Sequence, residues 1–298
     1  MDGWLVIDKP LGLSSARVVA LVRRATGSKA GHAGTLDPMA TGVLPIALGE
    51  ATKTVQYAMS GLKRYRFRVR WGEGRTTDDS KGAVVAESAT RPSRGEIEAI
   101  LPRFAGRLLQ RPPAYSALKI GGRRAYALAR AQRVPELAPR PVEIRELRLC
   151  DMPDRDHADF EADVGKGTYI RALARDMALE LGTLGHVAAL RRLSVGRFTL
   201  DQAISLELVA ALPHIPAASG HLLPVEAALD DIPALSLTAA EAASLRHGRS
   251  VTPRDPGERA RLDQLDDGTI VSARHDELLI ALTRIENGGL RPVRVINR

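Results

Sequence analysis

The chain has 298 residues, 44% of them hydrophobic, enough to bury one substantial core and a second small one. Its single cysteine, Cys150, excludes an internal disulfide, and no Cys/His cluster has zinc-site spacing, so no metal is expected. Residues 1–10 contain no positively charged leader before a long apolar run, and no stretch of about eighteen apolar residues occurs, so we expect a cytoplasmic protein without a membrane partner.

The positive charge is concentrated in one segment. The net charge is +8, and residues 101–148 alone hold eleven Lys and Arg against three Glu, which accounts for the whole excess. A basic patch that neutralises several phosphates gives salt-dependent affinity for nucleic acid. We therefore predict a polyanionic partner for this segment. The alternative is a basic face that is merely solvated.

A strand and a helix are predicted at the N-terminus. Residues 4–7 form a short apolar run typical of a buried strand. Ser14 or Ser15 can cap a following helix, and Gly27 lies just past its end. The apolar positions that give this helix a buried side are Val18, Val19, Leu21 and Val22.

Residues 31–45, with the sequence GHAGTLDPMATGVLP, place three glycines around one carboxylate, Asp37. Glycines allow sharp turns and the close approach of a ligand. Pro38 disfavours helical geometry at the preceding residue, so Asp37 is expected to project from a defined, non-helical backbone. The alternative is an ordinary turn, in which Gly, Pro, Asp and Thr are common.

Residues 63–71 alternate strictly between two kinds of side chain. Arginines occupy one face, and the other carries Tyr65, Phe67, Val69 and Trp71. This period predicts an amphipathic strand. Tyr65 lies near the start of the strand, close to Gly61, where its ring can reach a pocket, although periodicity alone favours a core position.

The basic segment is rich in turn-forming residues. Prolines at 112, 113, 135, 139 and 141 and a glycine pair at 121–122 predict a mobile loop outside the central sheet that orders on binding. Its cations Lys119, Arg123 and Arg124 are expected to contact phosphates, which position a nucleic acid without reading its sequence.

Residues 165–182 are predicted to form a loop and a helix. Helical spacing places Ile170, Leu173, Met177 and Leu181 on one face, and Gly182 is a natural stop. Arg171 falls in the first turn, where a cation opposes the helix dipole. This cost indicates another partner for Arg171, and the alternative is a surface arginine.

A small second unit is expected at the C-terminus. Residues 212–220 resemble a linker, and residues 222–229 are expected to pack back on the first unit. Thr238 and Glu241 form a capping box for a helix that ends before Gly248. Residues 278–283 and 291–296 are predicted strands, joined through a turn at 287–289.

Four of these segments resemble the TruB family, the tRNA pseudouridine-55 synthases. They are residues 31–53 (GHAGTLDPMATGVLPIALGEATK), 63–65 (KRY), 111–130 and 165–182. The resemblance implies an α+β (mixed α/β) pseudouridine synthase fold with a central, largely antiparallel sheet and the active site in its cleft. It also implies a catalytic domain at 1–232, with an RNA-gripping thumb insertion at about 111–142, and a PUA-like domain at 233–298.

The resemblance also implies roles for individual residues. Asp37 would be the catalytic nucleophile, paired with Arg171, whose guanidinium keeps the carboxylate ionised and oriented. Tyr65 would stack on the target uracil, Tyr169 would line the same pocket, and His32 would fill the space that the flipped base vacates. Substrate contacts are also assigned to Lys9, Lys119, Arg123 and Arg124.

The segment at residues 71–82 follows the family only loosely. Trp71 stands where leucine is common and Arg75 where threonine is common. Asp79 is therefore assigned either a supporting position behind the site or a contact with RNA.

The implied reaction is the isomerisation of uridine to pseudouridine in the T-loop of tRNA. It changes neither the redox state nor the atom count, so no cofactor is expected. The implied partner is the tRNA T-arm, and we expect a monomer without an obligatory protein partner. Two alternatives stay open: a synthase of this fold that acts on another RNA or position, with guide RNA and protein partners, and a non-catalytic tRNA chaperone or RNA-binding protein.

Overall fold

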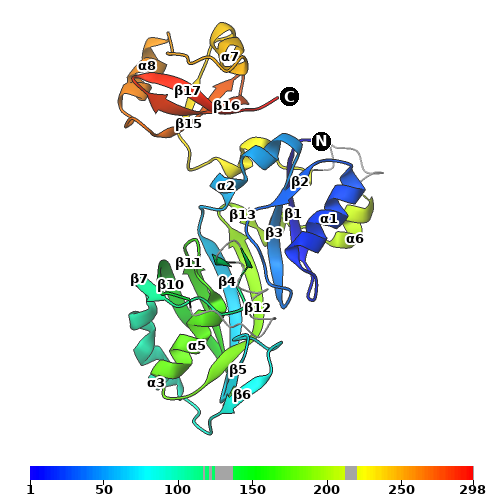
Figure 1. The fold of residues 1–298 in the computed structure, drawn as a ribbon, viewed down its shortest axis with the longest axis vertical. Coiled ribbons are helices and arrows are strands. Elements are labelled where there is room, and N and C mark those ends of the chain that lie inside the picture. Colours follow the sequence, from blue (N-terminus) through cyan, green and yellow to red (C-terminus); the bar gives the residue numbers. More distant parts are fainter. Residues whose placement is uncertain (117, 121–122, 125–136, 212–219, 298) are drawn as a thin grey trace.

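The computed structural model describes residues 1–116, 118–120, 123–124, 137–211 and 220–297. Its largest element is a nine-stranded sheet (Figure 1). The main path runs through β1 (Gly3–Lys9), β3 (Ala40–Leu48), β12 (Gly185–Val195), β4 (Lys63–Trp71), β11 (His157–Val164), β10 (Arg140–Asp154) and β7 (Gly106–Gln110), with β2 (Ala30–His32) beside β3 and β13 (Phe198–Thr199) beside β12. Among the described strands of this sheet, β3 and β12 are the one parallel pair, so the expected largely antiparallel sheet is confirmed.

Helices and hairpins surround this sheet. The helices of the first unit are α1 (Ser15–Thr26), α2 (Val55–Ala58), α3 (Arg94–Ile100), α5 (Ile170–Glu180) and α6 (Leu206–Ala211), with 3₁₀ turns at Gly49–Lys53, Leu101–Phe104, Leu200–Gln202 and Val225–Ala228. Two hairpins lie outside it, β5 (Glu73–Arg75) with β6 (Val84–Glu87), and β8 (Lys119–Ile120) with β9 (Arg123–Arg124). None of the helices in the described ranges has the length and apolar character needed to cross a membrane.

Strand β4 has the predicted bounds and the predicted two faces. Its aromatic and apolar side chains are buried, and Phe67 stacks on Phe160 of β11 with ring centroids 5.4 Å apart. The opposite face is solvated, and Arg68 there pairs with Asp159 of β11 at 2.6 Å. The alternation thus reflects one face packed in the core and one face open to water.

Helix α1 begins and ends as its sequence predicts, and it also holds the loop that carries Asp37. Ser14 is the N-cap and accepts a hydrogen bond from the backbone N–H of Arg17, while Gly27 ends the helix in the left-handed conformation. Ser15 is buried, and its Oγ donates to the carbonyl of Leu36 and accepts from the Leu36 N–H. The helix therefore fixes the backbone immediately before Asp37.

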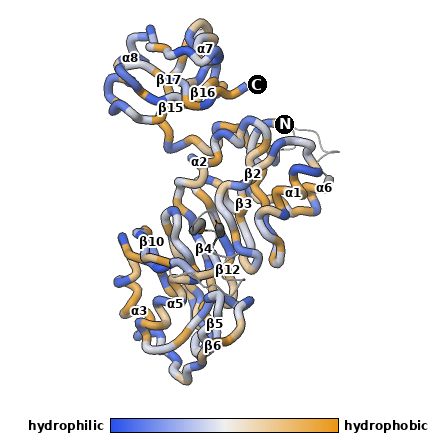
Figure 2. Tube along the Cα trace, in the orientation of Figure 1, coloured by the Kyte–Doolittle hydropathy of each residue, from blue (hydrophilic) through white to orange (hydrophobic). Residues whose placement is uncertain are grey.

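Helix α5 packs its predicted apolar face against the sheet. Ile170, Leu173 and Met177 are buried in the same core as Phe67, and Gly182 follows the helix with φ +68°. Figure 2 shows that α5 and α1 each combine hydrophobic and hydrophilic stretches, as expected of helices with one buried side. Arg171, in the first turn of α5, donates to the side chain of Asp37, so the start of this helix meets the loop of Asp37.

The prediction of a loop outside the sheet holds only for part of residues 111–142. Strands β8 and β9 pair with each other and not with the central sheet. Pro141 and its two neighbours, in contrast, belong to β10 and pair with β7, so the loop prediction is wrong there. Pro141 is tolerated because the ladder continues through the residues around it. The side chains of Lys119, Arg123 and Arg124 lie outside the described part of the structure, as do residues 125–136.

The C-terminal unit is a four-stranded sheet with two helices. It consists of β14 (Ala234–Ser236), α7 (Ala239–Arg246), α8 (Pro256–Asp263), β15 (Ile270–His275), β16 (Leu278–Glu286) and β17 (Gly289–Val295), with the strands in that order. The Thr238–Glu241 capping box is present. The sequence analysis missed β14, β15 and α8, and placed the last two strands within shorter or shifted bounds.

The turn between β16 and β17 explains why this hairpin was predictable. Asn287 and Gly288 both have positive φ, at +52° and +68°, the geometry that an Asn-Gly pair favours in a two-residue hairpin. The second unit also packs on the first, because Leu279 and Leu282 share a buried cluster with Trp4. A hydrogen bond from the Lys53 ammonium to the Val295 carbonyl, 2.8 Å long, adds to this contact.

Candidate active site

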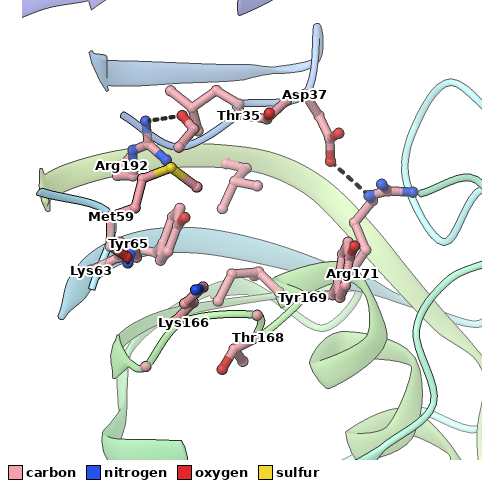
Figure 3. A pocket seen from close by; sticks show the side chains of 16 residues that line it. Thr35, Asp37, Met59, Lys63, Tyr65, Lys166, Thr168, Tyr169, Arg171 and Arg192 are labelled. Carbon is pink, nitrogen blue, oxygen red and sulfur yellow. Dashed lines mark hydrogen bonds and ion pairs between the residues drawn. The ribbon is translucent and has the colours of Figure 1, made fainter. Parts of the chain in front are cut away.

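A cavity of about 290 Å³ opens where the loop of Asp37 faces the start of α5 (Figure 3). Segments far apart in the chain converge on it. Its lining comprises residues 34–37, Met59, Lys63, Tyr65, residues 165–171, Leu190 and Arg192. The structure thus brings together Asp37, Tyr65, Tyr169 and Arg171, which the sequence analysis placed in one pocket.

Asp37 is reachable from solvent although its backbone is fixed. Its side chain is 37% exposed. The Asp37 carbonyl accepts a hydrogen bond from the Ala40 N–H, and the Pro38 carbonyl accepts one from the Gly12 N–H. The loop therefore holds the carboxylate in place and leaves one side of it open to the cavity.

Arg171 is the buried partner of Asp37. Its side chain is 4% exposed, and its Nε lies 2.9 Å from Asp37 Oδ2. Nη1 donates to the carbonyl of Thr77 and Nη2 to the carbonyl of Tyr115, each at 2.8 Å. Three donors on a rigid guanidinium fix its orientation. Asp37 is therefore the partner that was predicted for Arg171.

Tyr65 and Tyr169 form the aromatic walls of the cavity. Tyr65 is 9% exposed and projects from β4 into the cavity (Figure 3). Tyr169 is the N-cap of α5, and its backbone N–H donates to Gln110 Oε1 at 2.8 Å. Burial raises the pKa of the Tyr169 hydroxyl above its ordinary value, so this group stays neutral at physiological pH.

Comparison with known proteins covers the whole chain. The family model described as TruB family pseudouridylate synthase (N terminal domain) matches residues 22–170, and that of the tRNA pseudouridylate synthase B C-terminal domain matches residues 171–230. The chain belongs to the TruB family. A tRNA pseudouridine synthase B of Bradyrhizobium diazoefficiens is 54% identical over 100% of this chain and 86% of its own, and one of Rhodospirillum rubrum is 51% identical over 100% and 97%.

Solved structures show the same fold at lower identity. The archaeal box H/ACA sRNP Nop10-Cbf5 complex contains a chain with a TM-score of 0.74 and 23% identity, covering 99% of this chain and 86% of its own. A Cbf5-Nop10-Gar1 complex gives a TM-score of 0.76 and 23% identity, over 99% and 85%. The expected pseudouridine synthase fold is therefore confirmed for this TruB-family chain.

Lys9 lies inside the protein, which contradicts the expected direct contact with substrate. It is 0% exposed, and its ammonium donates to the carbonyls of Pro10 at 2.9 Å and Leu13 at 2.8 Å. Burial lowers the pKa of Lys9 to about 8, and the nearby charge of Asp37 opposes this shift. Lys9 is thus an internal cation behind the Asp37 loop. Nothing in its sequence position indicated this burial.

Asp79 lies behind Arg171 and not on the open surface. It is 5% exposed, and its Oδ2 is 3.7 Å from Arg171 Nε. Its Oδ1 accepts hydrogen bonds from Thr77 Oγ1 at 2.6 Å and from the Lys81 N–H at 2.9 Å. Of the two roles assigned to Asp79, this geometry fits the supporting position.

His32 lies on β2 and is not among the residues that line the cavity. Burial and the charge of Arg192 lower the pKa of His32 below its ordinary value. Its Nδ1 is buried and has no hydrogen-bond partner within the described residues. A neutral imidazole at this position suits contact with an uncharged base better than contact with a phosphate.

Three cations that line the cavity, Lys63, Lys166 and Arg192, were missed as site residues by the sequence analysis, and two of them are buried. Arg192 is 1% exposed, and it donates to the carbonyls of Val43 at 2.8 Å and Gly34 at 3.0 Å, on either side of Asp37 in the chain. Lys63 is 8% exposed and was noted only as the first residue of the Lys-x-Tyr match. Arg192 follows another arginine on β12, and no local pattern distinguishes the buried one.

Gly42→Ala is expected to disturb the active site through the backbone. Gly42 has φ +99°, and a Cβ there would lie 2.2 Å from the carbonyl oxygen of Arg192. Since neither the conformation nor the space suits alanine, we expect the free energy of unfolding to fall by about 1 to 3 kcal/mol. Calorimetry measures this loss. Gly95→Ala is the control, because a Cβ at Gly95 would point into open space. An equal Tm in both variants would contradict the prediction.

Proposed function

We propose that this protein isomerises uridine to pseudouridine at position 55 in the T-loop of tRNA. The observation that carries the proposal is the ion pair of Asp37 and Arg171 at the edge of a cavity that Tyr65 also lines. The family membership supports it, as do whole-chain identities above 50% to proteins named tRNA pseudouridine synthase B. We also propose that the enzyme is a cytoplasmic monomer that needs neither a cofactor nor a protein partner.

The arrangement supports a division of labour among the cavity residues. The target nucleotide must leave its stack to enter the cavity, which costs a few kcal/mol. Stacking on Tyr65 offsets about 1 to 3 kcal/mol of this cost, and His32 fills the vacated space. Asp37, held by Arg171, then acts as a covalent or electrostatic catalyst while the detached ring stays enclosed.

The test is the modification of an unmodified tRNA transcript by the purified protein. We expect one new pseudouridine, at position 55, and none in a transcript with cytidine at that position. Pseudouridine at another position would favour the alternative of a synthase with a different target. Binding of the transcript without modification would favour the RNA-binding alternative.

The basic segment is proposed to act as a thumb on the T-arm. The double substitution Lys119→Ala with Arg123→Ala is expected to weaken tRNA binding. The slope of log Kd against log salt concentration is expected to fall by the amount that about two phosphate contacts contribute. Titrations at several salt concentrations measure this slope. The control is Lys29→Ala with Arg17→Ala, which removes two exposed cations elsewhere. An unchanged slope in the thumb variant would contradict its contact with the RNA backbone.

We also propose the division into a catalytic domain at 1–232 and a PUA-like domain at 233–298. The two separate sheets support it, since the first strand of the smaller sheet begins at Ala234. We propose that the second unit assists tRNA docking, and its buried contacts with the first unit would hold it in a fixed position. The alternative is a unit that only stabilises the first.

A further inference from the structure

Two buried cations of the cavity have no carboxylate partner among the residues that the structure describes. Among the cavity residues that the structure describes, the ion pairs are those of Arg171 with Asp37 and Asp79. Lys63 donates to the carbonyls of Met59 and Gly61, each at 2.6 Å, and Arg192 donates only to carbonyls as well. A buried cation without a counter-ion is unfavourable, so this feature calls for an explanation.

The surroundings of Lys63 make the cavity more positive still. Burial, together with the charges of Arg192 and Lys166, lowers the pKa of Lys63 to about 8. Lys63 keeps one ammonium hydrogen, and Arg192 keeps its Nη1 group, beyond their hydrogen bonds to the described chain. Both groups can therefore donate to a ligand in the cavity.

The two cations lie at the end of the cavity where the base is expected. Figure 3 shows Lys63 and Arg192 on the side of Tyr65, and Asp37 with Arg171 on the other side. If the target uracil stacks on Tyr65, as the proposed function holds, its ring lies beside the cations and its sugar lies toward Asp37.

The reaction creates a negative charge on that ring. When the C1′–N1 bond breaks, both of its electrons stay on uracil, and the charge spreads over N1 and the carbonyl oxygens. C1′ is satisfied by a bond to an Asp37 oxygen, or by a C1′–C2′ double bond once C2′ loses its proton. Both routes therefore make the ring anionic.

The second half of the reaction removes this charge. C5 bonds to C1′ and the Asp37 oxygen departs with its electrons, or the glycal regains a proton at C2′. C5 then loses its proton and N1 gains one, which leaves a neutral pseudouridine. The need for a positive environment is thus confined to the interval between bond cleavage and bond formation.

We propose that Lys63 and Arg192 stabilise the negative charge on the target uracil between cleavage of the C1′–N1 bond and formation of the C1′–C5 bond. This inference rests on the proposed function. Fixed donors aimed at developing charge in a site that excludes water are typically among the largest contributions to catalysis. The alternative ligand for the two cations is an RNA phosphate, and binding measurements distinguish the two.

The experiment compares Lys63→Gln, which removes the charge and keeps a hydrogen-bond donor, with Lys63→Arg, which keeps the charge. The full-length protein in excess is mixed with tRNA transcript, and the single-turnover rate, the tRNA Kd and the Tm are measured. We expect Lys63→Gln to lower the rate about 10²-fold with an unchanged Kd, and Lys63→Arg to recover most of the rate. Lys29→Gln, at an exposed lysine outside the cavity lining, is the matched control.

Three outcomes would overturn the inference. An unchanged rate in Lys63→Gln would show that its charge is not used, and a weaker Kd with an unchanged rate would assign it to a phosphate. Equal losses in Lys63→Gln and Lys63→Arg would indicate a structural role. A lowered Tm in Lys63→Gln would mean that this variant is destabilised. In that case the same measurements are made on Arg192→Gln, which removes the charge, and on Arg192→Lys, which keeps it. An inactive wild type would instead contradict the proposed function itself.

Discussion

Asp37→Asn is expected to abolish pseudouridine formation and to leave the fold and the binding of tRNA largely intact. The substitution keeps the shape of the side chain, and the amide oxygen can still accept from Arg171 Nε. It removes the charge on which both nucleophilic and electrostatic catalysis depend. Because loss of a nucleophile typically costs about 10⁴-fold or more, no product is expected in a standard assay.

The measurement is site-specific mapping of pseudouridine in tRNA over long incubation, with the tRNA Kd determined in parallel. Asp201→Asn is the matched control, because Asp201 is an exposed aspartate that does not line the cavity, and we expect this substitution to leave the rate unchanged. Activity of Asp37→Asn within tenfold of wild type would remove Asp37 from the mechanism. Loss of tRNA binding together with activity would assign it a role in recognition.

Arg171→Lys is expected to reduce both catalysis and stability although it keeps the charge. A lysine cannot reach Asp37 Oδ2 and the carbonyls of Thr77 and Tyr115 at the same time. Buried acceptors left without donors cost about 1 to 3 kcal/mol each. We therefore expect the free energy of unfolding to fall by about 2 to 4 kcal/mol and the single-turnover rate to fall about 10² to 10³-fold, through misorientation of Asp37.

Urea unfolding and single-turnover kinetics on one preparation separate the two effects. The control is Arg94→Lys, since Arg94 pairs with Glu98 at the surface, where the side chains are 51% and 52% exposed. Such exposed pairs contribute little, and a change within about 0.5 kcal/mol is expected. A wild-type rate in Arg171→Lys would show that Asp37 needs only a nearby positive charge and no fixed geometry.

Local rules explain why several elements were predicted correctly. The bounds of β4 follow from strict alternation, and those of α1 from Ser14 and Gly27. The hairpin at Asn287 and the capping box at Thr238 depend on neighbouring residues alone. Strands β14 and β15 were missed because their short apolar runs carry no distinctive period.

For the site, the sequence determined which residues have the right chemistry. Asp37 stands out by its glycine-rich, proline-flanked context, and the helix that begins near Arg171 was predictable from spacing. The need of Arg171 for a partner followed from the helix dipole. The identity of that partner came from the family resemblance, and the structure places the two groups 2.9 Å apart across 134 residues of chain.

Only the tertiary structure decided which of the charged residues are buried. Lys9, Lys63, Asp79 and Arg192 are each less than a tenth exposed. Alternation places Lys63 on the apolar face of β4, but the sequence contexts of the other three resemble those of surface residues. Burial of a charged group depends on backbone carbonyls and counter-charges supplied by distant segments, as Val43 and Gly34 do for Arg192. Local periodicity carries no information on such partners, because they meet only when the sheet has formed.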